Sequence, residues 1–336
     1  MFSLMKDAAL EELHLCRRGQ LNAVIAIHNL KLGPALGGCR FIPYDSEQDA
    51  IQDATRLARG MSYKAALAKV PQGGGKSVII QPKGEFNRFE LFKQFAQFVD
   101  ELGGRYITAM DSGTQVQDMD CIREITPYVS SSSNIGDPSP STAKGVAAGI
   151  KTAVGFALGS DLKGVRVAIQ GLGHVGHDLA KHLHAEGAEL VVADINSDKV
   201  QQAESEFSAK SVNVDDIHKQ DVDVFAPCGL GGAINLQTID ELKCQIVAGC
   251  ANNQLATSEM GDQLHQHSIL YAPDYVINSG GLIFASSRYR GMEGSEIDRS
   301  ILKLKDTLNT IFTLSKNKDK PTYLIADEMA EQILYG

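Results

Sequence analysis

The sequence lacks several features that would assign it to a simple class. It has no excess of positive charge, because 32 Lys and Arg stand against 41 Asp and Glu, for a formal net charge of −9. This balance gives no general attraction to nucleic acid or to anionic membrane, and no basic stripe reverses it locally. No apolar run reaches the roughly 18 residues that cross a bilayer. We therefore expect neither a nucleic-acid-binding nor a membrane protein.

Motifs built on cysteine and histidine are missing too. The six cysteines are scattered without a CxxC pair, and the nine histidines include no HExxH. His174 and His177 lie three residues apart, but in a glycine-rich turn and the helix expected after it. The first residues carry acids early and lack the apolar core of a secretory signal. We expect free thiols, a cytoplasmic location and no metal site.

The chain does contain enough apolar sequence for two domains, since 43% of its 336 residues are hydrophobic. The stretch SSSSNIGDPSPST at 130–142 cannot continue a helix or a central strand, and we place the boundary there. The first domain is expected to span 1–134 and the second 135–317. Ser141 or Thr142 is expected to cap the long helix that opens the second domain.

The first domain is expected to mix strands and helices. Strands are predicted at 20–30, at 77–80 after three glycines, and at 105–108 just before Asp111. A helix with a capping box at Ser46 is predicted to run past Lys64, and a second helix covers 86–102.

The second domain alternates strands and helices, which predicts an α/β fold with a doubly wound parallel sheet of the Rossmann type. A turn at 171–176 precedes a helix at 177–187, which Gly187 is expected to end. The strands are predicted at 165–170, 189–195, 221–227, 245–251 and 268–274.

The turn carries the spacing of a dinucleotide site. Gly171, Gly173 and Gly176 follow a strand and open a helix, and Asp194 ends the next strand. The helix N-terminus suits a pyrophosphate. The carboxylate suits ribose hydroxyls and would repel the 2′-phosphate of NADP, so NAD is expected. The alternative is a Rossmann-like domain that binds another nucleotide or none.

Lys76 is the most suggestive single residue. It follows three glycines and precedes an apolar strand, so its stem is expected beside a buried wall. Burial lowers the pKa of an ammonium, and a lysine tuned in this way can act as a general base near neutral pH.

At this point the sequence resembles a known family, the Glu/Leu/Phe/Val amino-acid dehydrogenases, and is closest to its leucine dehydrogenase branch. The matching segments run in family order over nearly the whole chain: GPALGGCR (33–40), MSYKAALAKVPQGGGKSVII (61–80), YITAMDSGT (106–114), DPSPSTAKGV (137–146), AIQGLGHVG (168–176), VFAPCGLGG (224–232), AGCANNQL (248–255) and APDYVINSGG (272–281).

The resemblance implies roles for single residues. Lys64 would hold the substrate α-carboxylate, Lys76 would activate the water that attacks the imino acid, and Asp111 would relay protons. Asn253 would contact the substrate or the nicotinamide, although Asn252 could do so instead. Other residues that the resemblance assigns to the cofactor are Thr142, His174, Val175 and Cys228, beside Gly171, Gly173, Gly176 and Asp194.

The resemblance also implies what each domain does. Residues 1–134, with a returning segment at 318–336, would form the substrate, catalytic and oligomerisation domain, and residues 135–317 the NAD-binding domain. A homo-oligomer is expected, with the choice between dimer and octamer left open. The small-molecule partners would be an amino acid, its 2-oxo acid and ammonia.

The expected substrate pocket is apolar. A glutamate dehydrogenase of the family places a lysine where Leu36 stands and a hydroxyl where Ala285 stands, and an unpaired carboxylate against these residues would be costly. Leucine, isoleucine or valine would fit. Phe284 and Met110 depart from the leucine pattern and could favour phenylalanine or tryptophan, although Phe284 is more simply explained as a core residue. The expected lining comprises Leu36, Gly37, Gly38, Met61, Ala109, Leu282 and Ala285.

Two rival functions belong to other classes. One is a Rossmann oxidoreductase acting on a hydroxy acid or a folate, which would have no need for Lys76 after a glycine triplet. The other is a non-catalytic nucleotide-sensing relative, which would be expected to have lost Lys76 or Asp111, and both are present.

Overall fold

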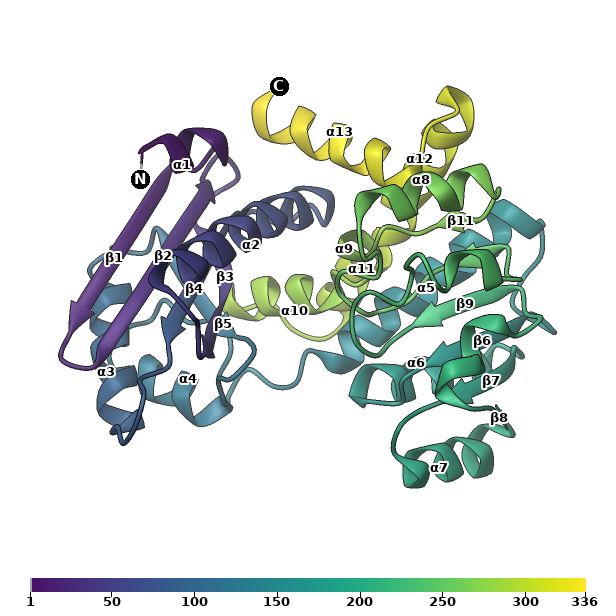
Figure 1. The fold of residues 1–336 in the computed structure, drawn as a ribbon, viewed down its shortest axis with the longest axis horizontal. Coiled ribbons are helices and arrows are strands. Elements are labelled where there is room, and N and C mark those ends of the chain that lie inside the picture. Colours follow the sequence, from purple (N-terminus) through teal and green to yellow (C-terminus); the bar gives the residue numbers. More distant parts are fainter. Residues whose placement is uncertain (1) are drawn as a thin grey trace. The chain divides into compact units, whose positions relative to one another are not determined.

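The computed structural model describes residues 2–336, which divide into two compact units (Figure 1). Unit 1 comprises 1–136, 285–293 and 330–336, and unit 2 comprises 137–284 and 294–329. The division lies two residues after the boundary predicted from the serine- and proline-rich stretch. The segments that return to unit 1 are shorter than the predicted 318–336, and 285–293 is an addition. No helix within 2–336 is long and apolar enough to cross a membrane.

Unit 1 is built on a mixed five-stranded sheet of order β1-β2-β4-β3-β5. The strands β1 and β2 pair antiparallel, as do β2 and β4, whereas β3 lies parallel to β4 and β5. The elements are α1 (Phe2–Asp7), β1 (Glu12–Arg18), β2 (Leu21–Asn29), β3 (Ala35–Ile42), α2 (Glu47–Leu67), β4 (Gly73–Ile80), α3 (Arg88–Asp100), β5 (Tyr106–Met110) and α4 (Val116–Arg123).

Helices cover both faces of this sheet (Figure 1). On one face Val24, Ala26 and Val78 pack against the alanine-rich side of α2. On the other face Ile79 and its neighbours pack against the phenylalanines of α3. Strand β2 is therefore buried on both sides rather than alternating, which is why its run is almost wholly apolar.

Helix α2 begins where the capping signal predicts. Ser46 is its N-cap, and the Ser46 hydroxyl accepts the N–H of Asp49 at 3.1 Å. Lys64 lies in its last turn, as expected from the sequence.

The glycine triplet lies inside β4 rather than before it. A Cβ added to Gly74 would come within 2.0 Å of the Ser62 nitrogen in α2, and one added to Gly73 within 1.9 Å of the Asn29 carbonyl oxygen. The glycines thus allow α2 and β2 to lie directly against the start of β4. Because of this close approach, Lys76 lies next to helix α2, which also carries Lys64.

Unit 2 contains a six-stranded sheet, parallel throughout, of order β11-β10-β9-β6-β7-β8. The order runs outward in both directions from the β6/β9 pair, which confirms the predicted doubly wound α/β fold. Its strands are β6 (Arg166–Gln170), β7 (Glu189–Ala193), β8 (Lys210–Ser211), β9 (Val224–Pro227), β10 (Ile246–Val247) and β11 (Leu270–Tyr271).

The helices of this part of the chain complete the fold. They are α5 (Ser139–Leu158), α6 (His174–Ala185), α7 (Ser197–Phe207), η1 (Val214–Lys219), η2 (Ile239–Glu241), α8 (Ser258–Gln266), α9 (Asp274–Ile277), α10 (Gly280–Tyr289), α11 (Ser295–Leu302), α12 (Leu304–Lys318) and α13 (Thr322–Tyr335). Helices α10 and α13 each continue from unit 2 into unit 1.

Two local predictions in unit 2 were wrong. Helix α5 begins at Ser139 with Pro138 as its N-cap, so Ser141 and Thr142 lie inside the first turn and do not cap it. A proline fits there because the first helical N–H groups have no intrahelical partner. Helix α6 starts at His174, within the predicted turn, and its C-cap is Glu186. Gly187 follows at φ +85° and ends the helix as predicted, since its N–H donates to the His184 carbonyl at 2.9 Å and the Ala188 N–H donates to the Leu183 carbonyl at 3.1 Å.

Strand lengths were also overestimated toward the sheet edge. The predicted strands at 245–251 and 268–274 form two-residue ladders, and the short edge strand β8 was missed. A buried apolar run does not reveal how much of it pairs, because burial by helices and burial within a ladder look the same in sequence.

Candidate active site

The catalytic candidates of unit 1 share one face of its sheet. Gly74 faces Ser62 of α2, so Lys76, two residues later in β4, faces α2 as well. Leu36 of β3 is in register with Gly74 and with Ile107, and Gly38 is in register with Ala109. Strand alternation thus places Leu36, Gly38, Lys76 and Ala109 on the α2 face.

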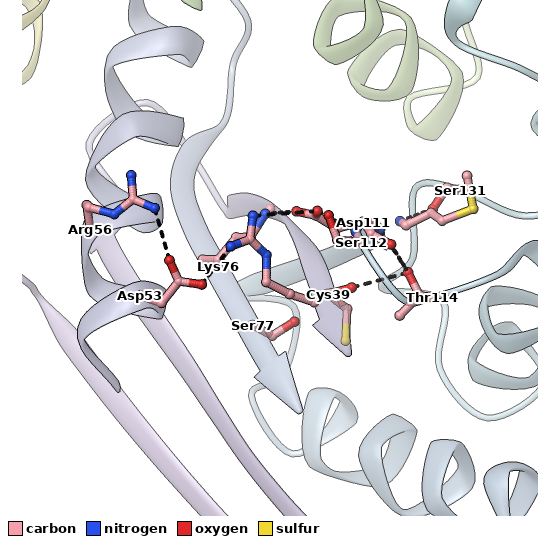
Figure 2. Close-up of polar contacts among 12 residues, drawn as sticks. Cys39, Asp53, Arg56, Lys76, Ser77, Asp111, Ser112, Thr114 and Ser131 are labelled. Carbon is pink, nitrogen blue, oxygen red and sulfur yellow. Dashed lines mark hydrogen bonds and ion pairs between the residues drawn. The ribbon is translucent and has the colours of Figure 1, made fainter. Parts of the chain in front are cut away.

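Lys76 and Asp111 lie in contact and form an ion pair (Figure 2). The Lys76 side chain is only 6% exposed and that of Asp111 20%. Asp111 directly follows β5, at the carboxyl edge of the parallel strands, where the sequence placed it. Gly38 makes room for it, since a Cβ there would come within 2.7 Å of the Asp111 carboxylate.

Burial sets the charge state of Lys76. Removal of the ammonium from water, together with the nearby positive charges of Arg40 and Lys64, lowers the pKa of Lys76 to about 7. At neutral pH both the charged and the neutral amine are therefore populated. The lysine can exchange a proton with water or substrate without an external base.

The turn after β5 holds Asp111 in place. The Asp111 N–H donates to Thr114 Oγ1 at 2.8 Å, and the Ser112 N–H donates to Asp111 Oδ1. One residue earlier, the Met110 N–H donates to Ser131 Oγ at 2.6 Å (Figure 2). The aspartate is therefore presented by a hydrogen-bonded turn rather than by a free loop.

The other predicted substrate residues of unit 1 differ in exposure. Lys64 and Met61 are half-buried on α2, one helical turn apart, and Leu36 is 2% exposed. Ala285 is half-buried in α10, where the neighbouring Ser286 hydroxyl donates to Gln72 Oε1 at 2.6 Å.

Gly37 differs from the rest, because strand alternation turns it to the opposite face of the sheet. There its carbonyl accepts the Tyr106 hydroxyl at 2.8 Å.

Unit 2 carries the glycine turn at the switch point of its sheet. Gly171 has φ +99°, and a Cβ there would meet the Gly229 nitrogen at 2.8 Å. A Cβ on Gly176 would come within 2.0 Å of the Gly171 carbonyl oxygen, so strand, turn and helix approach too closely for side chains. At Gly173, by contrast, no described atom lies within 4 Å of an added Cβ. The open side of the turn is therefore the one from which a pyrophosphate would approach the helix N-terminus.

Asp194 lies beside this turn at the end of β7. Its Oδ2 accepts the Leu172 N–H at 2.6 Å and its Oδ1 accepts the Asn196 N–H at 2.8 Å. Each carboxylate oxygen keeps a second acceptor position, so the side chain is oriented and can still accept ribose hydroxyls. The residues of unit 2 therefore fit a dinucleotide.

The remaining predicted cofactor residues lie in the first turn of α6 and in the loop after β9. His174 is exposed at the first position of α6 and Val175, next to it, is half-buried. The Cys228 N–H donates to the Gln170 carbonyl at 2.7 Å, which ties the end of β9 to the end of β6.

Two further predicted contact residues lie close to glycines: Asn253 in the loop after β10, and Thr142 in the first turn of α5. Asn253 is exposed at φ +52°, and its carbonyl accepts the Gly232 N–H at 2.7 Å. The Thr142 hydroxyl lies 2.8 Å from where Gly281 would carry a Cβ. Leu282, the next residue after Gly281, is buried.

The sequence-based selection of residues missed the polar partners of the pair. Arg40 and Thr114 were inside the matching segments GPALGGCR and YITAMDSGT but received no role. Little in the sequence favoured the selection of Asp53, which is an acid next to the apolar positions of α2. Ser131 was hidden in a run of four serines.

The fold and the two groups of residues define a class, the dinucleotide-dependent oxidoreductases. Residues 16–128 match the family model described as Glu/Leu/Phe/Val dehydrogenase, dimerisation domain. Residues 192–293 match the model described as Glutamate/Leucine/Phenylalanine/Valine dehydrogenase. The chain belongs to the Glu/Leu/Phe/Val dehydrogenase family, which confirms the predicted family. It is an amino-acid dehydrogenase, acting on a CH–NH₂ group with an NAD(P)-type cofactor.

Known relatives are similar over almost the whole chain. Leucine dehydrogenase of Bacillus subtilis is 45% identical, covering 99% of this chain and 93% of the relative. Leucine dehydrogenase of Geobacillus stearothermophilus is 46% identical, with 99% and 92% covered. The crystal structure of L-tryptophan dehydrogenase from Nostoc punctiforme superposes with a TM-score of 0.91 at 39% identity, covering 99% of this chain and 98% of that one.

Proposed function

We propose that this protein catalyses the reversible, NAD-dependent oxidative deamination of an apolar L-amino acid of the leucine, valine or isoleucine type. The products would be the 2-oxo acid, ammonia and NADH. The observation that carries this proposal is a buried lysine in contact with an aspartate, on a face whose neighbouring side chain, Leu36, is apolar and almost fully buried. The names of the relatives at 45% and 46% identity support it.

The proposed roles follow from charge and placement. Lys64 would hold the substrate α-carboxylate as a fixed cation. Asp111 would accept a proton from the substrate ammonium, because an amine must be neutral before its α-carbon can lose hydride. The nicotinamide, when bound, supplies the hydride acceptor.

The second half of the reaction is hydrolysis of the imino acid. With a pKa of about 7, neutral Lys76 can take a proton from water as the water attacks the α-carbon. The resulting ammonium would then stabilise the negative charge that develops on the new hydroxyl oxygen as the carbonyl forms. Asp111 would return its proton to the amine, the C–N bond would break and ammonia would depart, and the freed carboxylate would accept the remaining hydroxyl proton as the carbonyl of the 2-oxo acid forms.

A substrate panel tests the proposal. With NAD present we expect NADH formation with leucine, valine and isoleucine, and none with glutamate or with 2-hydroxy acids. Glutamate should fail because no cation replaces Leu36 to meet its side-chain carboxylate. Activity with hydroxy acids alone, or NAD binding without turnover of any amino acid, would contradict the proposed reaction.

An aromatic substrate is the second candidate, with phenylalanine or tryptophan in place of leucine. Met110, directly before Asp111, is 41% exposed, but strand alternation turns it away from the α2 face that carries Lys76 and Ala109. L-tryptophan dehydrogenase of Nostoc punctiforme is 41% identical over 98% of this chain. Tryptophan and phenylalanine in the same panel decide between the two candidates through kcat/KM.

The cofactor preference is proposed to depend on Asp194. Asp194→Arg should lower the ratio of kcat/KM with NAD to that with NADP by roughly a hundredfold, because a cation replaces the ribose-binding anion. Asp198→Arg, an exposed acid in the first turn of α7, is the matched control and should leave the ratio unchanged. The same ratio in Asp194→Arg as in the wild type would remove Asp194 from the ribose site.

We also propose the predicted division of labour, with residues 1–134 binding substrate and 135–317 binding NAD. The remaining cofactor and substrate residues, among them Asn253, Thr142, Cys228 and Leu282, keep their proposed roles. A homo-oligomer is proposed because residues 16–128 match a dimerisation domain.

A further inference from the structure

We propose that Arg40, held in place by Asp53 of helix α2, is a positioning residue that orients Asp111 toward Lys76 and keeps a fixed positive charge beside the pair. This role rests on the proposed function, because it concerns the same two reacting groups. The inference comes from a chain of charged contacts that joins α2 to three strands of unit 1.

The chain of contacts begins on α2. Asp53 Oδ2 accepts Arg40 Nη1 at 2.7 Å and the Tyr44 hydroxyl at 2.7 Å, while its Oδ1 accepts Arg56 Nη2 at 3.0 Å. Burial alone would raise the pKa of Asp53, but the hydrogen bond from Tyr44 and the charges of Arg40 and Arg56 together lower it. Asp53 is thus a firmly ionised anchor for the guanidinium of Arg40.

From Arg40 the chain reaches the reacting pair. Its Nη2 lies 4.0 Å from Asp111 Oδ1, whereas Asp111 Oδ2 contacts Lys76. The two oxygens of one carboxylate therefore face two different cations, and because Oδ1 also accepts the Ser112 N–H, Arg40 and Ser112 together restrict the rotation of the carboxylate. In Figure 2 the side chains of Arg56, Asp53, Lys76 and Asp111 follow one another across the view.

The position of Arg40 leaves one of its hydrogen-bond donors unpaired. Its Nε is buried and has no hydrogen-bond partner among residues 2–336. A buried donor without an acceptor is destabilising, so fold stability alone would not select this arrangement. The two Nη atoms, by contrast, face Asp53 and Asp111.

Arg40 and Asp53 act on Lys76 with opposite signs. The positive charge of Arg40 lowers the pKa of Lys76, and the negative charge of Asp53 raises it. The other charged or titratable groups on the packed elements are Lys64 of α2, which lowers this pKa, Cys39 of β3, which raises it, Asp111 after β5, and His28 of β2, whose pKa burial lowers to about 4.

The test is the pH dependence of kcat/KM for leucine deamination. In the wild type, activity should rise with pH through about 7 as Lys76 loses its proton. Arg40→Gln should move this acid limb to higher pH by roughly half a unit or more, and Asp53→Asn should move it to lower pH. A role in folding alone could not move the limb in opposite directions.

Maximal rates supply a second readout. Arg40→Gln should lower kcat by about tenfold with KM for leucine changed less than about twofold, because Asp111 is misoriented while Lys64 is untouched. Arg40→Lys keeps the positive charge but loses the two-pronged guanidinium. The acid limb of the pH profile should therefore stay at the wild-type pH, and kcat should be partly restored. Arg56→Gln, which removes an exposed partner of Asp53, is the matched control and should leave the limb in place.

The outcomes separate the two proposals. Suppose that the wild type deaminates leucine. The positioning role is then overturned if the acid limbs of Arg40→Gln and Asp53→Asn coincide with that of the wild type, or if both shift in the same direction. If the wild type turns over no amino acid, the proposed function fails. NMR of nitrogen-labelled lysine then still reports whether the two substitutions shift the pKa of Lys76 in opposite directions.

Discussion

Replacing Lys76 by alanine is expected to lower kcat for oxidative deamination by about a thousandfold or more, with NAD affinity retained. The loss has two causes, since the variant has neither a base for the attacking water nor a cation for the developing charge. NAD affinity should persist because the glycine turn and Asp194, which are proposed to bind NAD, belong to unit 2, whereas Lys76 belongs to unit 1. Steady-state kinetics and a direct NAD-binding titration measure the two quantities.

A surface lysine provides the matched control for this experiment. Lys83 is exposed in the loop after β4, and Lys83→Ala should keep wild-type turnover. Turnover of Lys76→Ala close to that of Lys83→Ala would exclude Lys76 from the chemistry. Loss of NAD binding along with turnover would instead point to a folding defect, which circular dichroism would reveal.

The second large effect is expected at Asp111. Asp111→Asn preserves the shape of the side chain but removes the proton acceptor, and kcat should fall by about a hundredfold to ten-thousandfold. It also leaves the buried Lys76 ammonium without its counter-charge, so the pKa of Lys76 should fall further. The residual activity should therefore show its acid limb at a pH below that of the wild type.

Asp45→Asn, an exposed acid in the loop before α2, controls for a general change of charge and should behave like the wild type. Wild-type kcat in Asp111→Asn would show that another group transfers the proton. A limb displaced to higher pH would show that Asp111 does not act electrostatically on Lys76.

Much of the fold could be predicted because local signals and global packing agree in this chain. The Ser46 cap, the apolar spacing of α2, and the strand–turn–helix around Gly171 each depend on neighbours within a few residues. Prediction was wrong where two local signals compete for the same helix start, and where strand pairing depends on distant segments. Pro138 opens α5 ahead of the expected cap, and the last strands pair over only two residues each.

The candidate site divides in the same way. Lys64, Lys76, Asp111 and the glycine turn could be selected from the sequence, because their motifs are contiguous and the family resemblance extends over nearly the whole chain. Their catalytic roles stay predictions until the variants are measured. Arg40 and Asp53 could not be selected as a pair, since nothing in the order of residues shows that β3 and α2 bring them within hydrogen-bonding distance.

The order of residues alone determined which side chains are available, namely a lysine after a glycine triplet and an aspartate after a short strand. Only the packed structure decided that they touch, and that Arg40 and Asp53 accompany them. The physical reason is that propensity and spacing act over a few residues, whereas the pKa of a buried amine depends on charges that the fold gathers from distant segments.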